Sequence, residues 1–123
     1  MTILWLGVAG ALGAMARYGV GVLFSRWSSS GFPWATLAVN LAGCFALGFL
    51  AAYAFEHPEA GLRTRLIAGT GFLGAFTTFS TFGVETFAAF ESGEWFAGAA
   101  NIALNVLGGV LLAAAGFAVA RAA

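Results

Sequence analysis

The sequence contains no aspartate and no lysine, and it has only one histidine and one cysteine among its 123 residues. Few acids, bases or nucleophiles are therefore present for catalysis, and no residues show the spacing of a metal site or a phosphate-binding loop. The lone cysteine, Cys44, excludes an intrachain disulfide, and its place inside an apolar run favours a packed, unreactive thiol. We expect that the protein is not an enzyme.

Charge is also scarce, since charged residues make up 8% of the chain and five basic residues balance five acidic ones. A balanced chain without a basic cluster is not expected to bind nucleic acid. Hydrophobic residues instead make up 61% of the chain, and the mean hydropathy is +0.93. No soluble domain could cover so much apolar surface, so we predict an integral membrane protein in contact with lipid.

Continuous apolar runs occupy most of the chain. Each reaches about twenty residues, which lets a helix cross ~30 Å of hydrocarbon, whereas an outer-membrane barrel would need shorter, alternating segments. We therefore predict an all-α integral membrane protein with one domain, residues 1–123, and four transmembrane helices. Pro33 is suited to open the second helix, because a residue in the first turn needs no partner for its N–H. The predicted spans are residues 2–24, 33–55, 62–90 and 95–119.

The third predicted span is longer than a bilayer requires, so it is either tilted or broken. Gly71, Gly74 and the pair Thr77-Thr78 favour a break near its middle. A continuous helix, bent by threonine hydroxyls that bond to the preceding turn, is the alternative.

The arginines show only a weak bias between the two sides of the membrane. Four spans put both termini on one side, which would hold Arg63, Arg65 and Arg121, while Arg26 lies on the other side. This bias favours cytoplasmic termini but is small enough to permit insertion in both directions. Four short helices offer little interior for polar groups, so we also expect the chain to self-associate.

Several polar side chains lie inside the apolar runs. Arg17 either anchors the first helix by reaching the headgroups or attracts anions in an aqueous vestibule. Its presence, with no basic residue before it, also indicates a retained helix rather than a cleaved signal peptide. Asn40, Asn101 and Asn105 need hydrogen-bond partners in hydrocarbon. They either join helices or, in the case of Asn40, donate an N–H to a permeating anion.

Residues 69–85 concentrate glycine, hydroxyl groups, phenylalanine and one carboxylate within the third span. Hydrocarbon offers such groups no partner, so they are expected to face protein, water or an ion. The edge of a phenyl ring carries positive potential, so an anion can lie beside it while threonine and serine hydroxyls donate alongside. Packing is the alternative for these rings. Helical spacing would place four of them on one face, namely Phe72, Phe76, Phe79 and Phe82.

The same stretch contains a candidate cation site. If the helix opens between Gly74 and Thr77, main-chain carbonyls become available, and such carbonyls bind alkali cations in membrane proteins. A plain kink is the alternative. Glu85 would either pair with Arg17 or cap the pathway. The physical chemistry of the residues thus predicts an anion-tolerant pathway.

Taken together, these residues resemble the fluoride channel family, the Fluc or CrcB proteins, which are small bacterial and archaeal exporters. The resemblance covers nearly the whole chain, and the segment Thr-Thr-Phe-Ser-Thr-Phe beside an intramembrane asparagine is its most specific part. The motifs that carry it are Gly10-x-x-Gly13-Ala14-x-x-Arg17-Tyr18, Pro33-Trp34-x-Thr36-x-x-x-Asn40-x-x-Gly43, Gly71-Phe72-x-Gly74-x-x-Thr77-Thr78-Phe79-Ser80-Thr81-Phe82 with Glu85, and Asn105-x-x-Gly108.

The resemblance implies an antiparallel, dual-topology homodimer in the cell's inner (plasma) membrane, with two fluoride pores along the subunit interface. Phe79 and Phe82 would contact fluoride edge-on, and Asn40 would donate to it. The hydroxyls of Ser80 and Thr81 would belong to the same polar neighbourhood.

The resemblance also implies a structural sodium ion at the dimer centre, bound by the carbonyls of Gly74 and Thr77 from both subunits. Arg17 would lie near the vestibule. The fourth helix offers asparagines where the family often has hydroxyl-bearing residues. Further residues that could face the pore are Thr36, Glu85, Asn101 and Asn105.

The implied function is passive export of toxic cytoplasmic fluoride down its electrochemical gradient. A small multidrug or proton-coupled transporter of dual topology is the alternative, and it would use Glu85 as its proton-cycling carboxylate. A second alternative is a membrane subunit whose polar residues only join helices.

Overall fold

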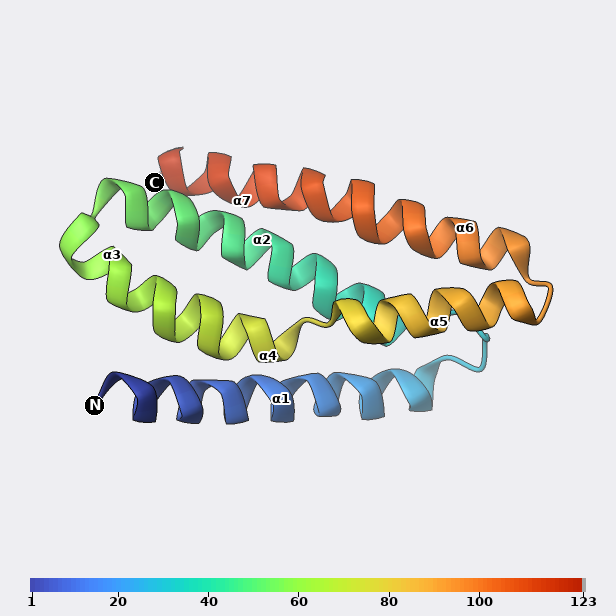
Figure 1. Cartoon of the computed structure of the whole chain (residues 1–123). Coiled ribbons are helices and arrows are strands. Elements are labelled where there is room, and N and C mark those ends of the chain that lie inside the picture. The colour runs from blue at the N-terminus through green and yellow to red at the C-terminus, as the bar shows by residue number, and fades with distance from the viewer. Residues whose placement is uncertain (123) are drawn as a thin grey trace.

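The computed structural model describes residues 1–122, with residues 59–61 described as backbone only. Four of its helices are long and apolar enough to cross a membrane: Thr2–Trp27, Trp34–Glu56, Leu62–Glu91 and Trp95–Ala122. The predicted all-α class with four such helices is confirmed for the described residues (Figure 1).

The third and fourth of these helices are divided into shorter elements by changes in their backbone pattern. The first two spans are single helices, α1 (Thr2–Trp27) and α2 (Trp34–Glu56). The third consists of α3 (Pro58–Thr64), the π-helical η1 (Arg65–Leu73), α4 (Gly74–Phe76) and α5 (Phe79–Glu91). The fourth consists of α6 (Trp95–Ala103), the π-helical η2 (Leu104–Gly108) and α7 (Gly109–Ala122).

Pro33 precedes α2 instead of occupying its first turn. Its ψ angle of 63° lies outside the helical range, and its carbonyl accepts the first helical hydrogen bond from the Leu37 N–H at 3.1 Å. Pro33 is therefore the N-cap, and the helix begins one residue later than the sequence suggested.

The third span is broken between α4 and α5, where two residues are extended. Thr77 has ψ 161°, and Thr78 has φ −153° and ψ 115°. Thr78 caps α5, because its Oγ1 accepts the Thr81 N–H at 3.2 Å. The predicted break is confirmed. It also corrects the expectation of one continuous phenylalanine face, since two extended residues interrupt the helical period between Phe76 and Phe79.

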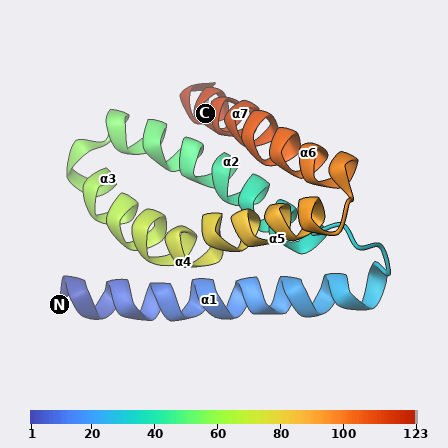
Figure 2. The same cartoon turned by 45° about the vertical axis from the view of Figure 1, so that its right-hand side comes forward.

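Helix α2 is the central element of the bundle. It packs along α7 on one side and against η1 on the other, while α1 lies along η1 and α4 (Figures 1 and 2). Gly13 lets α1 pack closely against η1, because a Cβ at that position would collide with the Phe72 carbonyl. Only 6% of the apolar part of α1 is buried within the chain, against 33% for α2. Most of the surface of α1 is therefore available for contact with lipid or with a partner chain.

Candidate functional site

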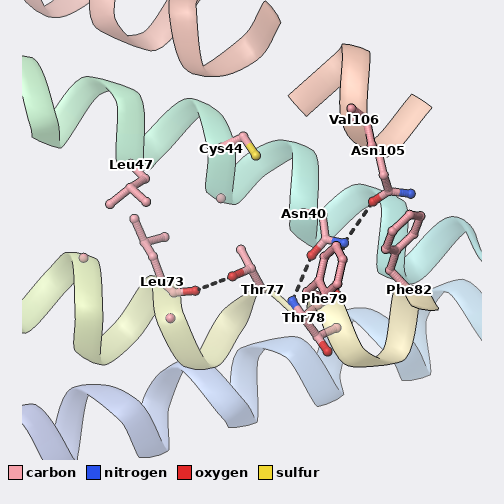
Figure 3. Close-up of a pocket in the computed structure, with 13 residues that line it drawn as sticks. Asn40, Cys44, Leu47, Leu73, Thr77, Thr78, Phe79, Phe82, Asn105 and Val106 are labelled. Atoms are coloured by element: carbon pink, nitrogen blue, oxygen red, sulfur yellow. Dashed lines mark hydrogen bonds between the residues drawn. The ribbon is translucent and has the colours of Figure 1, made fainter. Parts of the chain in front are cut away.

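A pocket of about 270 Å³ lies at the break in the third span, between α2, η1, α4, α5 and η2 (Figure 3). Its wall combines two amide side chains with two phenyl rings and the two extended threonines. We call it the break pocket. The residues that line it are Asn40, Gly43, Cys44, Leu47, Gly69, Leu73, Gly74, Thr77, Thr78, Phe79, Phe82, Asn105 and Val106.

Gly43 brings α2 against the break. A Cβ at this position would collide with the Thr77 methyl group, so the absence of a side chain at Gly43 leaves room for the side chain of Thr77. Thr77 is held in turn by its own hydroxyl, which donates to the Leu73 carbonyl at 3.0 Å. The close approach places Asn40, one turn before Gly43 on α2, beside the extended residues.

Asn40 takes over hydrogen bonds that the break leaves unmade. Its Oδ1 accepts the Thr78 N–H at 2.9 Å, and its Nδ2 donates to the Thr78 carbonyl at 3.2 Å. The same Nδ2 donates to Asn105 Oδ1 at 2.9 Å. Extended backbone inside a membrane is tolerated only when its polar groups have hydrogen-bond partners, and Asn40 is the partner of the Thr78 N–H and carbonyl.

A series of side-chain hydrogen bonds continues from Asn105 toward α5. Asn105 Nδ2 donates to the Asn101 side-chain oxygen at 2.9 Å and to its main-chain carbonyl at 3.0 Å. Asn101 Nδ2 donates to Thr86 Oγ1 at 2.9 Å, and Thr86 Oγ1 donates to the Phe82 carbonyl at 2.7 Å. Asn101 therefore joins two helices, α6 and α5, by a hydrogen bond, which is one of the two interpretations that the sequence left open. Asn105 lines the break pocket, whereas Asn101 does not.

The two phenyl rings of the pocket differ in exposure. Phe82 is 8% exposed and Phe79 is 81% exposed, with their centroids 5.5 Å apart and their planes tilted by 54°. Figure 3 shows both rings beside Asn40 and Asn105. Phe82 thus belongs to the inside of the pocket, while Phe79 projects from the chain. The other two phenylalanines form a separate stacked pair, Phe72 and Phe76, on the far side of the break.

Ser80 and Thr81 lie in the first turn of α5 but do not line the break pocket. The Thr78 hydroxyl donates to Thr81 Oγ1 at 2.9 Å and lies 3.4 Å from Ser80 Oγ. Three hydroxyls therefore gather at the N-terminus of α5, and both Ser80 and Thr81 are exposed on the surface of the chain.

Glu85 is bound by Thr36, on α2. Thr36 Oγ1 donates to Glu85 Oε1 at 2.8 Å, while the buried Oε2 has no hydrogen-bond partner among the described residues. The alternative that paired Glu85 with Arg17 is therefore wrong within this chain. Arg17, half-buried on α1, makes no hydrogen bond to the site residues. Glu85 and Asn101 line a second pocket of about 450 Å³, together with Ser92 and Glu94.

The two carbonyls of the candidate cation site are released from the helical hydrogen-bond pattern. In an unbroken helix they would accept the N–H groups of Thr78 and Thr81. Those groups donate instead to Asn40 Oδ1 and Thr78 Oγ1. The carbonyl oxygens of Gly74 and Thr77 thus have lone pairs available, and oxygen is the ligand that a hard cation prefers. The donor set of the break fits a sodium ion.

Sequence reasoning did not single out Thr86 as a functional residue. The signal was present, because Thr86 follows Phe82 by one helical turn in the same hydroxyl-rich stretch. Its partner Asn101 is distant in sequence, however, and only helix packing brings them together.

Comparison with known proteins identifies the family. The family model described as "CrcB-like protein, Camphor Resistance (CrcB)" matches residues 4–117. A protein of Dehalococcoides mccartyi named fluoride-specific ion channel FluC is 47% identical over 110 residues, which is 89% of this chain and 85% of the relative. A FluC protein of Rhizobium etli is 45% identical over 121 residues, which is 97% of this chain and 95% of the relative. FluC 2 of Listeria monocytogenes is 43% identical over 113 residues, with 91% and 84% covered. The chain belongs to the CrcB family.

Proposed function

We propose that this protein is a fluoride-specific ion channel of the plasma membrane, through which cytoplasmic fluoride leaves passively. Membership of the family, with several relatives named as fluoride-specific ion channels, is the observation that carries the proposal. It favours a channel over a proton-coupled multidrug transporter and over an enzyme. The four apolar helices agree with a multi-pass membrane protein.

The break pocket has the chemistry that a dehydrated fluoride ion needs. Phe79 and Phe82 offer ring edges of positive potential, and Asn40 offers an amide donor. None of the pocket residues carries a fixed positive charge, so an anion is stabilised without being trapped. In this proposal, Asn40 would donate to a passing ion with the hydrogen of its longer hydrogen bond, which is 3.2 Å to the Thr78 carbonyl.

Other site residues have supporting roles in this proposal. The hydroxyls of Ser80 and Thr81 extend the polar surface at the start of α5. The bonded pair Thr36 and Glu85 borders the pathway, and Arg17 draws anions toward the vestibule by its charge.

No energy source is needed for this function. Hydrogen fluoride crosses membranes as a neutral acid and dissociates in a more neutral cytoplasm, which leaves the anion inside. An interior-negative potential drives each charge outward with about 2.3 kcal/mol per 100 mV. The sequence has no nucleotide-binding motif, which agrees with a passive pathway.

A single chain does not enclose this pathway, and we propose that an antiparallel homodimer does. Phe79 and Gly74 both line the break pocket, yet both are exposed on the surface of the chain. A second copy packed against this face would cover them, and the weak arginine bias is compatible with insertion in both directions.

The two breaks would then face each other at the dimer axis, which supports a sodium site there. Gly74 and Thr77 from each subunit would provide the carbonyl ligands. A bound sodium ion would supply positive charge that neutralises their converging dipoles.

Fluoride efflux from liposomes, followed with a fluoride electrode, tests the proposed function. Purified protein should release trapped fluoride when a potassium ionophore offsets the charge, and it should retain trapped chloride. Proton uptake coupled to a cationic drug, without fluoride release, would sink the proposal in favour of the transporter.

A further inference from the structure

An open groove of about 730 Å³ lies where α7 packs against α2, and it shares no lining residue with the break pocket. Figures 1 and 2 show the two helices side by side, with the C-terminus near the turn from α2 into α3. We call it the α7 groove. The residues that line it are Gly48, Ala113, Ala114, Phe117, Ala118 and Arg121.

Small residues hollow out the α7 groove. Gly48 lets α7 lie against α2, because a Cβ at that position would collide with the Ala113 carbonyl. Ala114 and Ala118 are both exposed and follow one another at one-turn spacing along α7, where they contribute only methyl groups. The side chains of this part of the groove therefore offer dispersion contacts and no hydrogen bond, which suits a hydrocarbon chain.

The α7 groove ends at Arg121, close to the end of the fourth span. That span has 28 residues, so it is about 42 Å long at 1.5 Å per residue, and its last turns extend beyond a hydrocarbon core of ~30 Å. Arg121 is therefore expected at the depth of the lipid headgroups, whereas Ala113 lies about 12 Å deeper along the helix. The groove thus leads from the headgroup layer toward the hydrocarbon, as a phospholipid does.

The guanidinium of Arg121 is held at the rim of the α7 groove by an aromatic ring. Its Cζ atom lies 4.5 Å from the centroid of the Phe117 ring, one helical turn earlier. A guanidinium over a ring keeps its N–H groups free to donate in its own plane, and this fork matches two oxygens of a phosphate. No acidic residue lines the groove, so a negative ligand meets no opposing charge there.

We propose that an anionic phospholipid binds in the α7 groove, with its phosphate on Arg121 and one acyl chain along Ala118 and Ala114. Charge complementarity carries the choice of ligand. A neutral lipid would leave the guanidinium without a counter-charge, and a free phosphate ion would leave the apolar part of the groove empty. The site lies outside the proposed ion pathway, so the inference goes beyond the proposed function.

Thermal unfolding of the purified protein in a neutral detergent tests this proposal. Phosphatidylglycerol should raise the unfolding temperature at a lower mole fraction in the micelle than phosphatidylcholine, because a ligand of the folded chain stabilises it. Arg121→Gln should raise the half-saturating mole fraction of phosphatidylglycerol about tenfold, which corresponds to ~1.4 kcal/mol. Arg63→Gln is the matched control, since it removes the same charge from α3, at the same end of the bundle but outside the groove, and it should leave this fraction unchanged (Figure 1).

A second pair of variants tests the groove without altering its charge. Ala114→Leu fills the groove about two turns away from Arg121, so it should raise the half-saturating fraction several-fold. Ala115→Leu should not, because Ala115 is exposed on the same helix and does not line the groove.

The outcomes of these titrations are decisive. Equal titrations with the two phospholipids, or equal effects within either pair of variants, would overturn the proposal. Soluble glycerol phosphate, which lacks acyl chains, should not stabilise the protein; if it does so through Arg121, the site binds free phosphate and the lipid proposal is wrong. Fluoride is absent throughout, so the result is independent of whether the protein conducts fluoride.

Discussion

At the scale of single residues, Phe82 combines burial with contact to the break pocket. Its ring is 8% exposed, and its carbonyl accepts a hydrogen bond from the Thr86 hydroxyl at 2.7 Å. The side chain can change without loss of that main-chain bond, so a substitution here tests the ring alone.

Phe82→Ile should slow fluoride efflux by roughly tenfold or more, because an aliphatic side chain lacks the positive ring edge, and each ~1.4 kcal/mol of lost stabilisation is tenfold in rate. Phe87→Ile is the matched control. Phe87 lies on the same helix, is exposed, and lines none of the pockets described above. Liposome efflux measures both, and an equal loss in the two variants would argue against a role for the Phe82 ring.

Asn40 combines a structural and a proposed conductive role. Asn40→Ala would leave the Thr78 N–H and carbonyl and the Asn105 oxygen without their partner. We expect the free energy of unfolding to fall by about 2 kcal/mol and efflux to be lost. A thermal unfolding experiment in detergent measures the first effect. Unchanged stability would show that Thr78 finds other partners.

At the scale of elements, the contact between α2 and the break depends on a missing side chain. A Cβ at Gly43 would collide with the Thr77 methyl group, so Gly43→Ala should push α2 away from the break. The expected loss is about 1–3 kcal/mol in the free energy of unfolding, together with slower efflux, because Asn40 moves with α2.

Gly21→Ala serves as the control for this change. A Cβ at Gly21, on α1, would meet nothing within 4 Å in the chain. Alanine favours a helix over glycine by about 1 kcal/mol, so this variant should be as stable as the unsubstituted protein or more stable. Equal destabilisation by both substitutions would show that the contact between Gly43 and Thr77 is not the cause.

At the scale of the whole molecule, the proposed dual topology predicts that each loop is present on both sides of the membrane. Ser29→Cys in a Cys44→Ala background places one thiol in the loop between α1 and α2. A membrane-impermeant maleimide should label about half of the copies in intact cells, because the arginine bias is weak, and all of them after permeabilisation. Complete labelling, or none, in intact cells would mean a single orientation.

The proposed sodium site leads to a prediction for the whole molecule. Replacing sodium by a large organic cation on both sides of the liposome membrane should reduce fluoride efflux, because the carbonyls of Gly74 and Thr77 would then converge without a compensating charge. Restoring sodium should restore the rate. Efflux that is independent of sodium would remove the cation from the proposal while leaving the fluoride pathway intact.

The sequence by itself determined that the chain forms four apolar helices, and it favoured a break in the third without excluding a continuous, bent helix. Long apolar runs have only one stable solution in a bilayer, and glycine next to paired threonines weakens a helix locally. Family membership was likewise contained in local motifs such as residues 77–82, which need no three-dimensional information to be recognised.

Only the tertiary structure decided which polar groups meet. Phe79 and Phe82 differ in burial although both belong to one sequence motif, and Glu85 bonds Thr36 rather than Arg17. Asn101 and Thr86 come from different helices. The reason is physical: the partner of a buried polar group depends on how helices are packed and rotated, and the two extended residues at the break reset that rotation for all of α5.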